Sequence, residues 1–407
     1  MSRLVIPGFR AAGGAAGIKR NGALDLALVV SDVPATAAAV FTQNAFAAAP
    51  VLYDRDLVQD PEVRIQAVLI NAGNANACTG EPGMRAARRM AQAAEKALDL
   101  PPHRAFIMST GVIGVPLPVE KIERALPDLV RQLREDGWEE AAHAIMTTDT
   151  VPKLTQETLP APLAPAVIGG MAKGAGMIHP NMATMLSVIA TDVAISGELL
   201  ARALRHAVEA SFNRITVDGD TSTNDTVVVL ANGKVGHPPI LSADDPRFPL
   251  FVDMLTRVSR TLAQMIVRDG EGATKFVTIR VRGAVSQEDA LRAAKAVANS
   301  PLCKTAFYGG DANWGRVLAA VGYSGAQVDP HRVHLWFAGG REGRRGPALQ
   351  VVAGGTPTSY SEDEASHIFA QPEIDVLVDL GLGDGEAEVW TCDLSHDYVT
   401  INGAYRT

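Results

Sequence analysis

The stretch KGAGMIHPNMATMLSVIATD, from Lys173 to Asp192, combines residue types that could do covalent chemistry with a backbone that could position them. Glycine and proline crowd its first half, and an apolar run typical of a buried strand fills its second half. Thr184 stands where the loop would enter that strand. A threonine hydroxyl becomes a nucleophile when a neighbouring base removes its proton. Thr184 is therefore a candidate nucleophile.

The residue before Thr184 is small, which bears on how such a base would arise. Ala183 leaves room for the Thr184 hydroxyl to attack the preceding carbonyl carbon. An N-to-O acyl shift and hydrolysis would free Thr184 as a new N-terminus, whose α-amine has an ordinary pKa of about 7.7–8.0. That amine could activate its own hydroxyl. Taken alone, a threonine at such a junction more often has a structural role, because threonine favours strands.

Acyl transfer also needs hydrogen-bond donors for the oxyanion of the tetrahedral intermediate. The turn Ser109-Thr110-Gly111 follows the predicted strand Ala105–Met108 and supplies a hydroxyl and a glycine amide. Glycine also lets a backbone approach a ligand closely. Nothing in the sequence places this turn beside Thr184.

Other motifs are weaker. The string GGMAKGAG at Gly169–Gly176 lacks the spacing of a phosphate-binding loop, and we expect a tight backbone turn there. Asp218, Asp220 and Asp225 lack the rest of a calcium loop, so no metal site is predicted. The three cysteines are too scattered for a zinc site or a disulfide framework. We predict that the chemistry needs no metal or cofactor.

Composition narrows the class of protein. The chain has 407 residues, of which 47% are hydrophobic and 20% are charged, as in globular proteins. A net charge of -8 argues against a dedicated nucleic-acid binder, which would show a basic footprint. No apolar run reaches the roughly 18 residues of a membrane span, and the N-terminal residues do not resemble a secretory signal. We therefore expect a cytoplasmic protein with reduced thiols.

The pattern of apolar residues predicts a mixed α/β texture without a βαβ rhythm, and we favour an α+β fold of layered mixed or antiparallel sheets with flanking helices. The proline-rich stretch Pro152–Pro165 is expected to be a short connector. Strands are predicted at Leu26–Val30, Ala67–Asn71, Ala105–Met108, Thr226–Leu230, Phe276–Val281, Val333–Phe337, Ile374–Leu380 and Glu388–Cys392. Helices are predicted at Pro82–Leu98, Glu198–Ala210 with Ser196 as its cap, Leu250–Val267, and Ala290–Ala298 after a capping-box pattern at Ser286 and Asp289.

Several long strings together make the sequence resemble the ornithine acetyltransferase (glutamate N-acetyltransferase, ArgJ) family from about Asp25 to Thr407. They are NAGNANACTG at Asn71–Gly80, STGVIG at Ser109–Gly114, TTDT at Thr147–Thr150, KGAGMIHPNMATML at Lys173–Leu186, SFNRITVDGDTSTNDT at Ser211–Thr226, DGEGATK at Asp269–Lys275, SPLCKTAFYGGDANWGR at Ser300–Arg316 and INGAYRT at Ile401–Thr407.

The resemblance implies a function and a maturation step. Members transfer an acetyl group from N2-acetyl-L-ornithine to L-glutamate in arginine biosynthesis, and some also use acetyl-CoA. The precursor cuts itself at the bond that corresponds to Ala183–Thr184. The resemblance thus implies an α chain of residues 1–183 and a β chain of residues 184–407, in one interlocked fold like that of the related self-cleaving aminopeptidase DmpA. It also implies an α2β2 assembly.

The resemblance also assigns roles to individual residues. It makes Thr184 the nucleophile and Thr110 and Gly111 the oxyanion hole. The family's substrate-binding positions fall, together with Thr184, on Thr147, Lys173, Glu271, Asn402 and Thr407. Lys173 suits a substrate carboxylate and Glu271 suits the side-chain ammonium of ornithine. Thr148 is a rival for the role of Thr147.

Two alternative functions stay open at this point. A self-processed aminopeptidase or amidase of related fold would pass the acyl group to water. A non-catalytic amino-acid sensor would bind its ligand without turnover, although a sensor has no need of a nucleophile.

Overall fold

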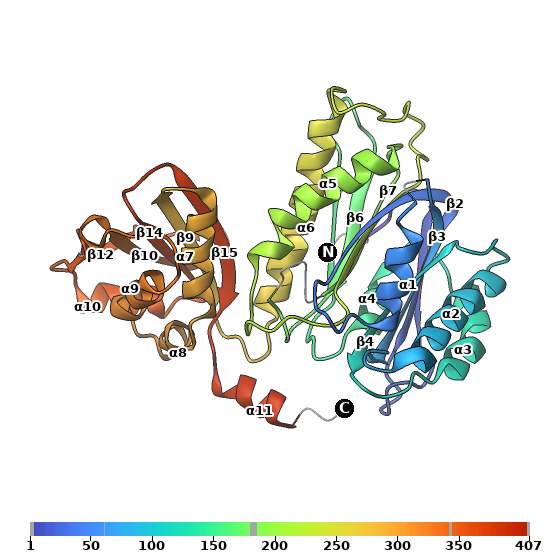
Figure 1. Ribbon diagram of the computed structural model, residues 1–407, viewed down its shortest axis with the longest axis horizontal. Helices are drawn as coiled ribbons and strands as arrows, with labels where there is room; N and C mark the ends of the chain where they lie inside the picture. The colour runs from blue at the N-terminus through green and yellow to red at the C-terminus, as the bar shows by residue number, and fades with distance from the viewer. Residues whose placement is uncertain (1–3, 61, 180–184, 342–343, 405–407) are drawn as a thin grey trace. The chain divides into compact units, whose positions relative to one another are not determined.

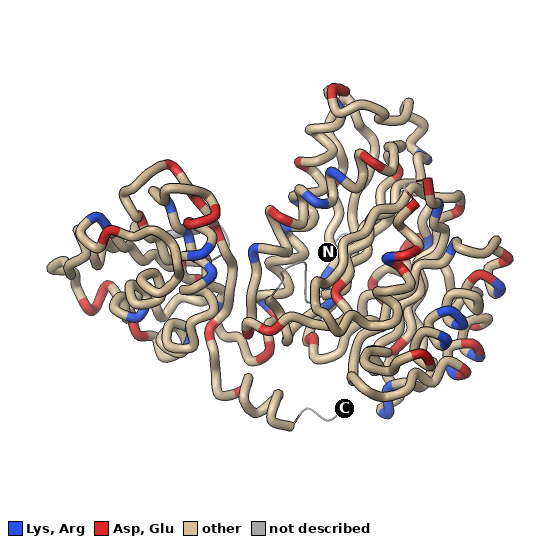
Figure 2. Tube along the Cα trace, viewed as in Figure 1, with Lys and Arg blue, Asp and Glu red and all other residues tan. Residues whose placement is uncertain are grey.

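The computed structural model describes residues 4–60, 62–179, 185–341 and 344–404, and the chain divides into two compact units (Figure 1). The first unit comprises Met1–Asn213, Asp220–Ile266 and Arg406–Thr407, and the second comprises Arg214–Gly219 and Val267–Tyr405. Each unit contains one mixed sheet. Figure 2 shows Lys and Arg interspersed with Asp and Glu along both units.

The sheet of the first unit has the order β4-β3-β2-β8-β7-β6-β5, and β1 also pairs with β2. The pairs β3–β4 and β7–β8 are parallel, and the other neighbours are antiparallel. The strands are β1 Phe9–Gly14, β2 Leu26–Phe41, β3 Arg64–Asn74, β4 Ala105–Val112, β5 Lys153–Thr158, β6 Val167–Lys173, β7 Leu186–Thr191 and β8 Thr226–Ala231.

Helices cover both faces of this sheet, because its strands are apolar on both sides. Along β2, Leu26 and Leu28 pack into the cluster of buried residues that α2 and α3 share, whereas Ala27 and Val29 pack into the cluster that contains Trp138 of α4. Alternate residues of a strand point to opposite faces, which explains this division. The helices are α1 Ala49–Leu57, α2 Gly80–Ala97, α3 Val119–Arg131, α4 Trp138–Ile145, α5 Gly197–Glu209 and α6 Arg247–Arg268.

The edge strand β4 has its outward N–H groups satisfied by two buried carboxyl groups. Asp54 on α1 accepts from the N–H of Ile107 at 3.0 Å. Glu95 on α2 accepts from the N–H of Ala105 at 3.3 Å and from the N–H of Arg104, the residue before β4, at 2.9 Å. An open sheet edge would otherwise leave these donors unpaired. Two helices thus lock the strand that leads to Thr110 and Gly111.

We predict that D54N stabilises the protein at neutral and alkaline pH. Burial raises the pKa of Asp54 well above its ordinary value of 3.8, against a smaller lowering by the Ile107 N–H. The folded state therefore holds a neutral carboxyl group that ionises on unfolding, so unfolding becomes easier as the pH rises above about 4. Asparagine keeps the acceptor and has no proton to lose.

Urea denaturation of D54N at pH 8 and at pH 4, beside wild type, measures this effect. The stabilisation should be present at pH 8 and should shrink toward pH 4. Exposed Asp56 on the same helix provides the control variant D56N, which should show no such trend. A D54N protein that is less stable than wild type at pH 8 would contradict the prediction.

The sheet of the second unit has the order β13-β12-β10-β14-β9-β15, with β11 paired to β10. Only β14–β9 is parallel among the described pairs. The strands are β9 Phe276–Ala284, β10 His334–Arg341, β11 Arg344–Arg345, β12 Leu349–Ala353, β13 Thr356–Pro357, β14 Glu373–Asp379 and β15 Gly385–Cys392. The helices are α7 Gln287–Asn299, α8 Pro301–Gly309, α9 Trp314–Gly322, α10 Glu362–Phe369 and α11 His396–Ala404, and the single turns η1 Phe212–Arg214 and η2 Pro330–Arg332 complete the chain.

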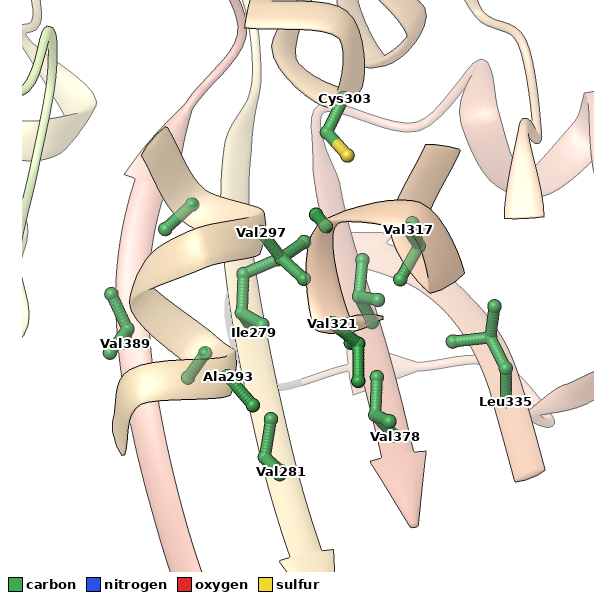
Figure 3. Packing of buried hydrophobic residues seen from close by; sticks show 14 of the residues in the cluster. Ile279, Val281, Ala293, Val297, Cys303, Val317, Val321, Leu335, Val378 and Val389 are labelled. Atoms are coloured by element: carbon green, nitrogen blue, oxygen red, sulfur yellow. The ribbon is translucent and has the colours of Figure 1, made fainter. Parts of the chain in front are cut away.

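Helices α7 and α9 pack on this sheet through small and branched aliphatic side chains, and α8 adds Cys303 and Phe307. Ala293 and Val297 of α7 meet Ile279 and Val281 of β9, and Val321 of α9 lies in the same cluster (Figure 3). Alanine on the helices allows close approach to the valine-rich strands. The scarcity of aromatic residues, 5% of the chain, is thus met by aliphatic packing.

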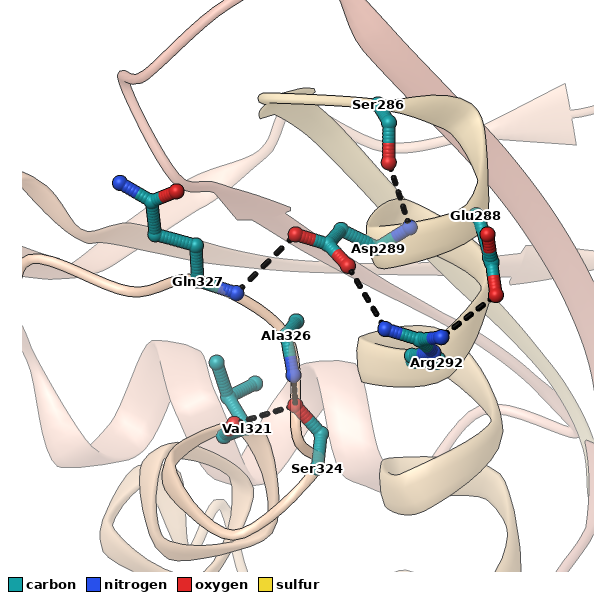
Figure 4. A network of polar contacts seen from close by, with 8 residues as sticks. All are labelled: Ser286, Glu288, Asp289, Arg292, Val321, Ser324, Ala326 and Gln327. Atoms are coloured by element: carbon teal, nitrogen blue, oxygen red, sulfur yellow. Dashed lines mark hydrogen bonds and ion pairs between the residues drawn. The ribbon is translucent and has the colours of Figure 1, made fainter.

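The start of α7 has the cap that the sequence predicts. The Ser286 hydroxyl accepts from the N–H of Asp289 at 3.1 Å, and the Asp289 carboxylate accepts from the N–H of Gln327 at 3.1 Å and from Arg292 at 3.2 Å (Figure 4). One aspartate therefore joins the helix start to the segment after α9. Ser196 caps α5 in the same way, through the N–H of Leu199.

The predicted fold class is confirmed, since two mixed sheets are layered with helices. Every predicted strand and helix overlaps an observed one. Most lie inside it or match its ends to within two residues, whereas the strand predicted at Val333–Phe337 is observed as β10, His334–Arg341, and continues four residues further. No helix among the described residues is long and apolar enough to cross a membrane. Within the same residues, no group of three or more His, Cys, Asp or Glu side chains is arranged to hold a metal ion.

Three predictions are wrong in whole or in part. The turn predicted at Ser109-Thr110-Gly111 belongs to β4, which continues to Val112. The turn predicted at Gly169–Gly176 is wrong for its first half, because Gly169 and Gly170 lie inside β6: a Cβ at Gly170 would sit 2.2 Å from the carbonyl oxygen of Val188, so only glycine fits beside β7. Residues 174–176 do follow the strand, where the chain bends. The expected connector Pro152–Pro165 contains β5, whose six residues pair with β6. The predicted division at Ala183–Thr184 lies outside the described residues and stays a prediction.

Candidate active site

The C-terminal end of β4 places Thr110 and Gly111 against β3. Gly111 has φ 131°, and a Cβ there would lie 2.3 Å from the carbonyl carbon of Gly73. Any side chain would push the two strands apart, so only glycine allows this approach. The close contact holds the Thr110–Gly111 backbone at the sheet end, as a preorganised oxyanion site would require.

A buried amide network fixes the same backbone from behind. The Ser109 hydroxyl donates to Asn71 Oδ1 at 2.6 Å, and Asn71 Nδ2 donates to the carbonyl of Asn74 at 2.8 Å. Asn224, just before β8, donates to the carbonyls of Ser109 at 2.9 Å and Ala75 at 2.6 Å. The asparagine-rich strings of the sequence therefore support the backbone around Thr110.

Lys173 ends β6 and reaches the same place. Its Nζ donates to Thr110 Oγ1 at 3.3 Å, although four strands separate β4 from β6 in the sheet order. Sheet twist, with a register shift in the long strand β2 between Val30 and Ala35, accompanies this convergence of distant strand ends. A hydroxyl that accepts from Lys173 keeps its own hydrogen to donate elsewhere.

Lys173 also marks the entry to β7. Lys173 pairs with Leu186 across the antiparallel β6–β7 ladder. The backbone carbonyl of the preceding residue, Met185, accepts from the N–H of Thr226 at 3.0 Å. Met185 is the residue directly after Thr184 in the chain. The predicted nucleophile is thus one residue from backbone that is held beside Lys173.

Asp149 is the buried carboxylate that joins these parts. One of its oxygens accepts from Lys153 Nζ at 2.7 Å and from the N–H of Gly174 at 2.6 Å. The other accepts from the N–H of Thr147 at 3.0 Å and lies 4.0 Å from Lys173 Nζ. Asp149 therefore positions both Thr147 and Lys173, and it anchors the first residue of the connection that leads to Thr184.

The charge of Asp149 is maintained by its partners. Burial alone would raise the pKa of this carboxyl, but the ammonium groups of Lys173 and Lys153 and the N–H of Gly174 together lower it to about 2. Asp149 is therefore ionised throughout the physiological range.

We predict that D149N lowers the free energy of unfolding at pH 7 by about 3–5 kcal/mol, as is usual when one partner of a buried ion pair is removed. The contribution of a carboxylate with a depressed pKa is complete above its ordinary pKa of 3.8 and is lost as the pH falls toward about 2. The gap between wild type and D149N should therefore narrow between pH 4 and the lowest pH at which both fold.

Chemical denaturation across that pH range is the measurement. Asp128, which pairs with Arg131 on the surface, offers the control variant D128N with an expected effect near zero. Equal stabilities of D149N and D128N at pH 7 would refute the central role of Asp149.

Glu271 and Asn402 form a second group, which belongs to the second unit. Glu271 is buried and accepts from Asn402 Nδ2 at 2.7 Å. The loop around Glu271 is held by Asp393, which accepts from the N–H of Thr274 at 2.8 Å, and by Ser395, which donates to the carbonyl of Gly272 at 2.6 Å. A buried glutamate on a fixed loop suits the binding of a cation.

The predicted site residues thus fall into three sets. Thr110, Gly111 and Lys173 lie together, and Thr147 joins them through Asp149. Glu271 and Asn402 contact each other. Ala183, Thr184 and Thr407 lie outside the described residues. Thr147 and Thr148 are both half-buried, so their exposure does not separate them.

Sequence reasoning missed Asp149 and Lys153. The only signal was position, since Asp149 is the single acid in the string TTDT and Lys153 follows four residues later. That spacing suggests a surface pair on a helix, whereas here the pair is fully buried at the start of β5.

Comparison with known proteins decides the family. The ArgJ family profile matches residues 10–407. The arginine biosynthesis bifunctional protein ArgJ of Symbiobacterium thermophilum is 50% identical over 402 residues, which cover 98% of this chain and 97% of that protein. The chain belongs to the ArgJ family. The Geobacter sulfurreducens ArgJ is also 50% identical, over 99% of this chain and 100% of that protein.

ArgJ relatives extend to eukaryotes and to solved structures. The mitochondrial ArgJ of Heterostelium pallidum is 43% identical over 98% of this chain and 94% of that protein. A crystal structure of ArgJ from Bacillus halodurans is 39% identical, with a TM-score of 0.50, and covers 55% of this chain and 100% of that chain. As a member of the ArgJ family, the chain is an acyltransferase.

Proposed function

We propose that this ArgJ-family enzyme transfers an acetyl group from N2-acetyl-L-ornithine to L-glutamate in arginine biosynthesis. The products are L-ornithine and N-acetyl-L-glutamate. The observation that carries the proposal is that Lys173 contacts Thr110, next to Gly111, and also pairs with Leu186, the first residue of β7, two residues after Thr184 in the sequence. Family membership over residues 10–407 supports the same reaction.

The proposed cycle is ping-pong, with Thr184 as the nucleophile. Its hydroxyl adds to the acetyl carbonyl of N2-acetylornithine, and its own α-amine takes the proton. The C–N bond of the amide then breaks, ornithine leaves with the proton, and the acetyl group stays on Thr184 as an ester. The amine of glutamate attacks that ester, forms the new amide and releases Thr184.

Self-cleavage between Ala183 and Thr184 provides the free α-amine in this proposal. Strands β6 and β7 are hydrogen-bonded neighbours, so a cut in the connection between them would leave both pieces in one sheet. The solved Bacillus halodurans chain aligns in full with 55% of this chain, which is about the share that residues 184–407 represent. Both facts support an α chain of residues 1–183 and a β chain of residues 184–407.

Thr110 and Gly111 stabilise the oxyanion in the proposed mechanism. Lys173, at 3.3 Å from Thr110 Oγ1, occupies the acceptor side of that hydroxyl and directs its hydrogen away. The same lysine is a point charge for the carboxylate that both amino-acid substrates carry. Thr147 completes this end of the site through its link to Asp149.

Glu271, with Asn402 beside it, binds the side-chain ammonium of ornithine in the proposal, and Thr407 contributes at the C-terminus. The reaction needs no cofactor, and acetyl-CoA is an alternative acetyl donor. We further propose an α2β2 assembly and a cytoplasmic location; these rest on resemblance to the family.

A T184A variant is expected to remain a single full-length chain and to transfer no acetyl group, because the only proposed nucleophile is gone. Intact mass measurement and an assay with N2-acetylornithine and glutamate check both points. Thr158, exposed on β5, offers the control variant T158A, which should mature and turn over as wild type does. Maturation or turnover of T184A would sink the assignment.

A T110A variant is expected to lose about 100- to 1000-fold in kcat, the usual cost of one oxyanion donor. T110S keeps the hydroxyl and should retain most of the rate. Mass measurement must first show that each variant has matured, so that slow cleavage is not mistaken for slow transfer. A T110A enzyme with unchanged kcat would remove Thr110 from the oxyanion site.

One assay separates the two alternative functions. An aminopeptidase or amidase would consume N2-acetylornithine at the same rate with and without glutamate, since water would accept the acyl group. A sensor would bind ornithine, stay uncleaved and show no turnover. The transferase requires consumption that depends on glutamate.

A further inference from the structure

A lysine that the site assignments leave out lies close to the end of β4, where Thr110 and Gly111 are. The segment between β1 and β2 is fixed by buried Asp25, whose carboxylate accepts from the N–H groups of Ala16 at 2.6 Å, Ile18 at 2.5 Å and Lys19 at 2.9 Å. Three backbone N–H groups thus donate to one buried carboxylate. They give the loop one defined conformation.

Lys19 is the side chain that this conformation aims at the sheet end. A Cβ at Gly73 would lie 3.2 Å from Lys19 Cγ and 3.5 Å from the backbone nitrogen of Lys19. The aliphatic part of the lysine side chain therefore passes close to Gly73. Gly73 in turn is the register partner of Gly111. Lys19 Nζ donates to the carbonyl of Leu24 at 2.7 Å, and an ammonium group has two further hydrogens.

Positive charges outnumber negative charges among five residues that these contacts join. Lys19, Lys153 and Lys173 bring three ammonium groups, and Asp25 and Asp149 bring two carboxylates. Each of the two carboxylates already accepts three of the hydrogen bonds described above. An anion of one charge would complete the set, and each proposed substrate carries an α-carboxylate.

We propose that Lys19 is a second substrate-binding cation, which holds the α-carboxylate of N2-acetylornithine and of glutamate together with Lys173. This inference rests on the proposed function and extends its substrate site by one residue. It gives the enzyme a means to select α-carboxylates, because two ammonium groups on one carboxylate discriminate strongly against a neutral amide.

Electrostatics at Lys19 agree with this role. Burial lowers the pKa of Lys19. The negative charges of Asp25 and Asp149 raise this pKa and partly offset the effect of burial, whereas the positive charge of Lys173 lowers it further. A bound carboxylate would offset the burial cost and favour the protonated lysine. Affinity for the substrate should therefore fall as the pH rises, and the fall should begin at a lower pH than it would for a lysine with an ordinary pKa.

The test compares N2-acetyl-L-ornithine with its α-carboxamide as acetyl donors for wild type and K19M. Methionine keeps an unbranched stem over Gly73 and removes the charge. We expect K19M to lose about 10- to 100-fold in kcat/KM with the carboxylate donor, through KM, the range for a hydrogen bond to a charged group. The carboxamide donor should lose less than about twofold, and K19R should restore part of the preference.

Lys121 supplies the matched control. It is a half-buried lysine of α3 whose side chain donates to the carbonyl of Gly17 in the same loop. K121M should leave both donors unchanged. Equal losses of K19M with both donors would mean a structural role for Lys19, and an unchanged K19M would mean no role; either result overturns the proposal.

Failure of the proposed function would look different. If wild type transfers acetyl from neither donor to glutamate, the proposed reaction is wrong, whatever K19M does. Calorimetric binding of N2-acetylornithine to wild type and K19M then still decides Lys19. If K19M binds N2-acetylornithine at least tenfold more weakly than wild type does, the result supports the carboxylate site. Equal affinities overturn it.

Discussion

The first unit depends on one buried charge, the carboxylate of Asp149. Its two oxygens gather backbone from the ends of α4 and β6 and the ammonium groups of two lysines. Burying a carboxylate is unfavourable unless such partners surround it. The energetic requirement therefore becomes a geometric one, because Asp149 is stable only where Thr147, Lys153 and Lys173 occupy their places. A single buried ion thus couples the stability of the fold to the shape of the site.

Glycine and asparagine complete this arrangement without adding charge. Gly111 and Gly73 bring two parallel strands closer than any side chain would allow. The side-chain amides of Asn71 and Asn224 donate to backbone carbonyl groups beside this contact. Rigid elements on both sides hold the approach, since β4 is locked by Asp54 and Glu95 from the helices. The result is a site built from strand ends and not from flexible loops, which suits preorganised electrostatics.

Local sequence patterns predicted many of the strands and several of the helices, but they left out β1, β5 and α3 among others, and they failed where contacts are distant. Apolar runs and caps such as Ser286 predicted strands and helix starts, because these depend on near neighbours. The first two glycines of GGMAKGAG were wrongly predicted to form a turn, because Gly170 is required by the backbone of β7 beside it. Asp149 and Lys19 were missed for the same cause: a buried ion pair and a stem over Gly73 exist only after the sheet ends converge. The roles of Thr110 and Lys173 came from family resemblance, and their contact came from the structure.

The pairing of β6 with β7 has a consequence for the proposed self-cleavage. If the connection between these strands is cut as proposed, the sheet would remain continuous while the covalent chain would not. Unfolding would then separate two molecules, and refolding would become a second-order encounter whose success depends on concentration. The stability of such an enzyme would be kinetic, because the covalent connection that brought the two strands together during the first folding would no longer exist. Maturation would thus make folding an event that each molecule completes once.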